Sequence, residues 1–182
     1  MLSAPVWRGR GPLVAFGAGL QFGALAVALV AGAVGGVVQA LLSRPAALVV
    51  LGVLALLVLA REAGLVTLPV PENRRLVPED VQHKGRVLGP LQFGFEMGTG
   101  MRTYSPSAVP HLVLIASVLV VPFTGVIAMA VGWGLARWIM AAASIVHDDD
   151  GEWSLLWQRY ARLLAVATTA GAITALALGL LS

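Results

Sequence analysis

The sequence contains no cysteine, which excludes disulfides, thiol redox chemistry, thiolate metal sites and cysteine nucleophiles from this chain. Charged residues are also scarce, at 12%, where a soluble domain carries about 25%. No serine triad, phosphate-binding loop, dinucleotide fingerprint or metalloprotease motif is present. We therefore expect a protein that is not an enzyme, with no catalytic residues and no cofactor.

Apolar residues take the place of the missing charge. They make up 58% of the 182 residues, and the mean hydropathy is +0.87. A bilayer is the solvent that suits such a chain, because helices satisfy their own backbone groups in hydrocarbon. The sequence predicts an all-α membrane bundle with one domain, 1–182, and about five transmembrane helices. The expected spans are 12–42, 46–65, 87–121, 126–146 and 163–181.

The basic residues indicate how these spans are oriented. With the N-terminus in the cytoplasm, five spans leave ten basic residues inside and only Arg44 outside. The ten are Arg8, Arg10, Arg61, Arg74, Arg75, Lys84, Arg86, Arg137, Arg159 and Arg162. We expect a multi-pass protein of the cell membrane with a cytoplasmic N-terminus, an outer C-terminus and a cytoplasmic loop at 61–86. The net charge of +3 then indicates anionic lipid as a partner rather than nucleic acid.

The first span and the longest loop each allow two interpretations. Arg8 and Arg10 before an apolar run are typical of a signal peptide, but the run is far longer than an h-region of about 7–15 residues, so we expect an uncleaved span. Gly19 and Gly23 within it favour close helix packing. The 61–86 loop is a solvated connector or a docking segment for another subunit.

The third apolar region, 87–121, is too long for one ordinary crossing and short for two. Gly94, Gly98 and Gly100 interrupt it, followed by Pro106 and Pro110. The pattern predicts a helix broken at about 94–110. The region is either one crossing that unwinds in its middle or a re-entrant piece followed by a span.

The same region contains the candidate site residues Glu96, Arg102, Tyr104 and His111. An ionisable group within a span costs about 2.5–3.5 kcal/mol on insertion scales, so such groups pair or face a cavity. One interpretation is an intramembrane polar site for an anion, a cation or a proton. The alternatives are a structural ion pair between Glu96 and Arg102, or an Arg102 that reaches the membrane interface.

Two further groups resemble metal ligands but have ordinary explanations. Met97, Met101 and His111 are soft ligands of the kind that binds Cu(I), yet methionine is also common apolar filling. His147 is followed by an acidic run, 148–150, which we interpret as a solvated loop. We expect no metal site. After this loop, a short interfacial helix from Trp153 is expected before the last span.

The order of the segments resembles the transmembrane module of the CcdA/DsbD family of thiol–disulfide electron carriers. The run LVAFGAGLQFG at 13–23 is similar to the second helix of the family module. The run 45–65, with Arg74 and Arg75 in the basic loop that follows it, is similar to the third. GPLQFGF at 89–95, continuing to Tyr104, Ser105 and Pro106, is similar to the broken fourth helix. The runs 127–135 and 159–181 are similar to the fifth and sixth.

Two departures qualify what the resemblance implies. The first family helix has no counterpart here, and no cysteine stands near Pro106, where the family carries one. The resemblance therefore implies a redox-silent relative, and the broader superfamily also contains exporters of ions and small solutes. We expect a scaffold, assembly or accessory subunit that binds another membrane protein or a second copy of itself. The alternative is a small-solute or ion transporter with its polar site at the broken helix.

Overall fold

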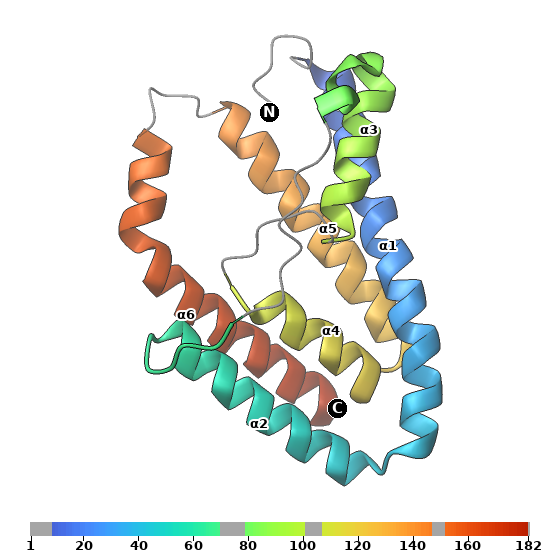
Figure 1. Cartoon of the computed structure of the whole chain (residues 1–182), viewed down its shortest axis with the longest axis vertical. Coiled ribbons are helices and arrows are strands. Elements are labelled where there is room, and N and C mark those ends of the chain that lie inside the picture. The colour runs from blue at the N-terminus through green and yellow to red at the C-terminus, as the bar shows by residue number, and fades with distance from the viewer. Residues whose placement is uncertain (1–8, 70–78, 101–106, 147–151, 182) are drawn as a thin grey trace. The chain divides into compact units, whose positions relative to one another are not determined.

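The protein is described by a computed structural model that covers residues 9–69, 79–100, 107–146 and 152–181. Throughout these ranges the regular structure is helical, as the sequence predicts (Figure 1). A 3₁₀ helix, η2 (Glu79–His83), precedes α3 in the chain. The α-helices are α1 (Arg10–Leu41), α2 (Arg44–Glu62), α3 (Gly85–Gly98), α4 (Val109–Leu119), α5 (Phe123–Val146) and α6 (Glu152–Leu181).

Within the described residues, four helical segments are long and apolar enough to cross a membrane: Arg10–Leu41, Arg44–Glu62, Phe123–Ala143 and Gln158–Ala177. The third apolar region behaves differently. Its two helices, α3 and α4, have 14 and 11 residues, and each is shorter than the roughly 20 residues that one crossing needs. The interruption expected at about 94–110 is therefore present, between Gly98 and Val109.

The structure refines which residues cause this interruption. Gly94 lies inside α3 and Gly98 is its last residue, so neither breaks the helix as the sequence had suggested. Pro110 lies in the first turn of α4, where its missing N–H costs nothing. The last segment also differs from expectation, because α6 is one helix from Glu152 without a separate interfacial helix.

The chain forms two compact units, and α1 contributes to both. The first unit comprises Met1–Leu29, Glu72–Tyr104 and Ile127–Trp153. The second comprises Val30–Pro71, Ser105–Val126 and Ser154–Ser182.

In the first unit, α3 runs beside the beginning of α1 with their backbones almost in contact (Figure 1). A Cβ added at Gly94 would collide with the Phe16 carbonyl, and one at Gly98 with the Leu20 carbonyl. In return, Cβ atoms at Gly19 and Gly23 would collide with the carbonyls of Leu91 and Phe95. Residue numbers rise together along this contact, so α1 and α3 are parallel. Only glycine permits so close an approach.

Apolar side chains fill the space around this contact. Phe16 stacks on Phe93 with ring centroids 5.8 Å apart, and Leu20 is fully buried. Val81 of η2 joins the same cluster.

On another side of α1, helix α5 runs antiparallel to it. The Trp138 Nε1–H group donates a hydrogen bond to the Leu13 carbonyl (3.0 Å), and Gln21 Nε2 donates to the Ala130 carbonyl (3.5 Å).

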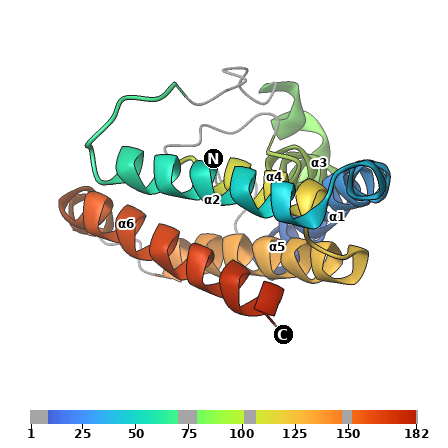
Figure 2. The same ribbon diagram turned by 90° about the horizontal axis from the view of Figure 1, so that it is seen from below.

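In the second unit, α2 and α4 pack against each other in opposite directions (Figure 2). The C-terminal end of α2 meets the start of α4, where Glu62 accepts a hydrogen bond from Ala108 N. Near the other end of α4, Gln39 at the end of α1 donates to the carbonyls of Val118 (3.2 Å) and Val121 (3.1 Å). Val118 lies in the last turn of α4, whose carbonyls have no partner within the helix, and Val121 lies just beyond that end.

Candidate functional site

Glu96, the first candidate residue, ends a series of polar side chains in the first unit. Lys84 Nζ lies 3.4 Å from Asp80 Oδ2 and donates a hydrogen bond to Gln92 Oε1 (2.9 Å). Gln92 Nε2 in turn donates to Glu96 Oε1 (3.1 Å). Gln92 and Glu96 are four residues apart and share a face of α3. Polar groups therefore connect the exposed Asp80–Lys84 ion pair to the half-buried Glu96.

Glu96 also lies at the end of α3, just before the helix is interrupted. The Thr99 hydroxyl donates to the Glu96 carbonyl (2.8 Å), which satisfies one of the backbone acceptors that a helix end leaves open. Gly100 then takes a positive φ of 71°, which ends the helical conformation at little cost because glycine has no Cβ. A carboxylate in this position can hold a cation or exchange a proton.

Of the other candidate residues, the structure describes His111 alone. Arg102 and Tyr104 lie outside the described residues. His111 is half-buried in the first turn of α4, which belongs to the second unit. The grouping of all four residues into one polar site stays a prediction.

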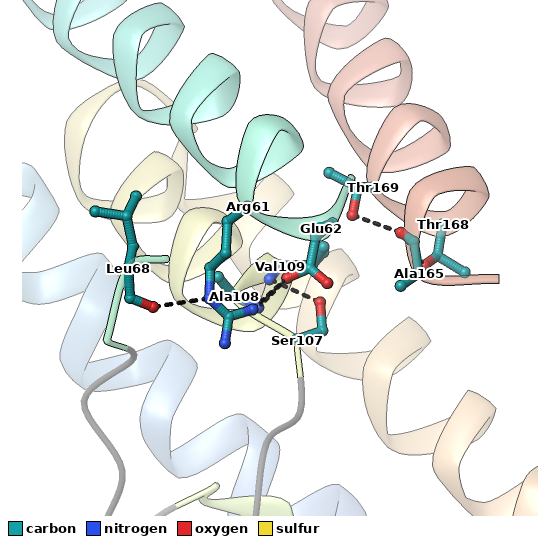
Figure 3. Close-up of polar contacts among 9 residues, drawn as sticks. All are labelled: Arg61, Glu62, Leu68, Ser107, Ala108, Val109, Ala165, Thr168 and Thr169. Atoms are coloured by element: carbon teal, nitrogen blue, oxygen red, sulfur yellow. Dashed lines mark hydrogen bonds and ion pairs between the residues drawn. The ribbon is translucent and has the colours of Figure 1, made fainter. Parts of the chain in front are cut away.

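A second carboxylate, which sequence reasoning had left among the loop charges, is more deeply buried. Glu62 is the last residue of α2 and is 9% exposed. Its Oε1 atom accepts hydrogen bonds from Arg61 NH1 (2.7 Å) and from Ala108 N (2.9 Å) (Figure 3). Arg61 is held as well, because its Nε–H group donates to the Leu68 carbonyl (2.9 Å). We call Arg61, Glu62 and the Ala108 N–H group the Glu62 joint.

The local sequence explains why α2 extends to Glu62. Leu65 N donates to the Ala60 carbonyl and Gly64 N to the Arg61 carbonyl, both at 2.8 Å. This is the hydrogen-bond pattern of a Schellman motif, and Gly64 supplies the positive φ of 77° that the motif requires. A glycine directly after an apolar run is the sequence signal that could have placed Arg61 and Glu62 inside the helix.

Electrostatics explains how the Glu62 joint holds together. A carboxylate at the C-terminal end of its own helix is unfavourable, but one at the N-terminal end of another helix is favourable. Ala108 immediately precedes α4, so Glu62 meets the positive end of α4, and Arg61 compensates its charge. The Oε1 atom is held by Arg61 and by a backbone N–H group, which is typical of a structural contact between helices rather than of a catalytic acid.

Neither carboxylate belongs to a recognisable metal site. Across the described ranges, no group of three His, Asp or Glu side chains is placed to hold a metal ion. His147 and the acidic run 148–150 lie outside these ranges, as does Met101.

The long apolar helices define the class of the molecule as an α-helical membrane protein. Comparison with known proteins does not narrow this class. No protein-family model matches the chain, and neither the curated proteins nor the solved structures contain a match.

Proposed function

We propose that this protein is a non-enzymatic scaffold or assembly subunit of a membrane complex. In this proposal it is a redox-silent relative of CcdA/DsbD-type transmembrane modules and lies in the cell membrane. Its N-terminus is cytoplasmic and its C-terminus is outside.

The observation that carries the proposal is the use of polar side chains inside the bundle. Trp138 and Gln39 each bond to the backbone of another helix, and Glu62 bonds to the N–H group that immediately precedes one. In hydrocarbon such bonds substitute for the hydrophobic drive that holds soluble helices together. Side chains committed to rigid helix contacts suit a protein that presents a fixed surface to a partner.

The helix directions support the proposed topology. Within the first unit α3 is parallel to α1 and α5 is antiparallel, and within the second unit α4 is antiparallel to α2. Within the first unit, an outward α1 gives an outward α3 and a returning α5; within the second, a returning α2 gives an outward α4. This pattern agrees with the distribution of basic residues.

Native mass spectrometry of the protein extracted into lipid nanodiscs tests the scaffold proposal. We expect a complex of fixed stoichiometry, with another membrane protein or with a second copy. A stable, lone monomer after this mild extraction contradicts the proposal. The topology has its own test, in which a tag at each end is probed on intact and permeabilised cells. Both tags reacting on the same face contradicts the five-crossing arrangement.

A transport function is the second candidate, because the polar series from Asp80 to Glu96 leads from exposed groups to a half-buried carboxylate at a helix interruption. Proteoliposomes on a solid-supported membrane can be tested for currents driven by proton, cation and anion gradients. This candidate predicts a current that Glu96→Gln abolishes and Thr174→Val preserves, because Thr174 bonds only within α6. The absence of any current, or an unchanged current in Glu96→Gln, contradicts it.

A further inference from the structure

An open hollow of about 590 Å³ lies along α6 in the second unit. The residues that line it are Arg159, Tyr160, Arg162, Leu163, Val166 and Ala167. The spacing of these residues, three and four apart, places them along one side of a helix. The hollow is therefore a feature of the α6 surface with two chemically different ends.

The first end of the hollow is cationic. The Arg159 guanidinium lies over the Tyr160 ring, 5.8 Å from its centroid. Arg162 extends toward the end of α2, where its guanidinium occupies the space that a Cβ on Gly64 would need. Among the described side chains, no carboxylate forms an ion pair with either arginine. Within this part of the chain, two exposed guanidinium groups one helical turn apart are available to an anion.

The second end of the hollow is apolar and continues into a membrane span. Leu163 is 65% exposed, and Val166 and Ala167 extend the apolar lining by a further turn. The candidate span Gln158–Ala177 begins at the cationic end, and only 6% of its most apolar stretch is buried. The hollow thus lies where polar side chains give way to hydrocarbon-facing ones.

We propose that this hollow binds an anionic phospholipid. The guanidinium groups of Arg159 and Arg162 hold the phosphate, to which arginine presents a planar fork of donors. An acyl chain lies along Leu163, Val166 and Ala167. A free phosphate would use only the cationic end, whereas a phospholipid matches both ends, and this match favours the lipid. The proposal does not depend on whether the protein is a scaffold or a transporter.

The amount of anionic phospholipid that the protein retains tests this lipid site directly. The full-length protein is reconstituted in nanodiscs of phosphatidylcholine with phosphatidylglycerol, released in the mass spectrometer, and scored for bound phosphatidylglycerol. We expect retention by the native protein and a loss of about tenfold or more in the Arg159→Gln/Arg162→Gln double variant, since each basic side chain near an anionic surface contributes about one decade or slightly less. Arg159→Lys/Arg162→Lys, which keeps the charge but not the fork, should retain an intermediate amount.

Controls separate this site from general charge attraction. Arg10→Gln removes an exposed arginine from the start of α1 and should leave retention unchanged. Added inorganic phosphate should not displace the lipid. Full retention in the double Gln variant, an equal loss in Arg10→Gln, or displacement by phosphate overturns the proposal. A protein bound to this face in place of lipid overturns it as well. Circular dichroism of each variant confirms that a loss of lipid does not reflect unfolding.

Discussion

In the first unit two helices meet through glycines, whereas in the second unit a buried carboxylate joins two helices. Gly94 and Gly98 of α3 lie against the backbone of α1. Glu62 of α2 instead reaches the backbone N–H group in front of α4. Both contacts join helices between which the hydrophobic driving force is small, because lipid is as apolar as the side chains.

The comparison teaches that these two kinds of contact fail for opposite reasons. The glycine contact tolerates no added atom, since the first carbon of any side chain would overlap a carbonyl. The Glu62 joint tolerates no missing atom, since a buried N–H group and a cation would lose their acceptor. A substitution that adds an atom to the glycine contact should therefore destabilise the first unit, and one that removes atoms from Glu62 should destabilise the second.

The largest effect is expected from Glu62→Ala. Removing the Glu62 carboxylate leaves the Ala108 N–H group without its acceptor and the half-buried Arg61 without this counter-charge, and we expect a loss of about 3 kcal/mol in the free energy of unfolding. Steric trapping in bicelles measures this quantity. Glu62→Gln keeps an acceptor for Ala108 N–H and should restore part of the loss. Equal stability of Glu62→Ala and the native protein would show that the joint does not hold α2 to α4.

The next effect in size is expected from Gly94→Ala. The added methyl group would force α3 away from the Phe16 carbonyl, and overpacking of this kind costs about 1–3 kcal/mol. The matched control is Gly132→Ala in α5, where the added methyl group meets nothing within 4 Å. If both variants change thermal stability by the same amount, the close contact between α1 and α3 is absent.

A smaller effect is expected from Gln39→Leu, which removes two hydrogen bonds, one to the last turn of α4 and one to Val121 just beyond it. Interhelical hydrogen bonds in membranes are worth about 0.6–2 kcal/mol, so we expect a loss of roughly 1 kcal/mol in the free energy of unfolding. Thr174→Val serves as the control because its hydroxyl bonds only to Ala170 of the same helix. Equal free energies of unfolding for Gln39→Leu and Thr174→Val would show that Gln39 does not stabilise the second unit.

The smallest effect is expected from Trp138→Phe in the first unit. This change keeps an aromatic ring beside Gly17 but removes the hydrogen bond to the Leu13 carbonyl. A loss of about 0.5–1 kcal/mol is expected, measured by the same unfolding assay. A loss larger than that of Gly94→Ala would show that polar bonds, and not glycines, dominate the first unit.

The long helices were predictable because apolar composition dictates them. The run after Arg10, the run between Pro45 and Ala60 and the run before Val146 each form a helix. The interruption near Gly100 was predictable too, because glycine and proline are concentrated there. Local signals of this kind depend on neighbouring residues alone.

Pairing between helices was not predictable in the same way. Gly94 and Gly98 looked like helix breakers, although they are packing residues, because their effect depends on the partner helix they face. Glu62 looked like a loop charge, because its acceptor role depends on Ala108, 46 positions away. One sequence states which residues are small or charged, but not which distant backbone they meet.

The continuity of α1 has a consequence for the membrane around the protein. Its 32 residues extend about 48 Å at 1.5 Å per residue, against a hydrocarbon core of about 30 Å. The helix must therefore lean, bend or project into the headgroups, or thicken the lipid beside it. Residues of both units belong to this one helix. The acyl-chain length of the surrounding bilayer, which affects the tilt of α1, should therefore affect both units.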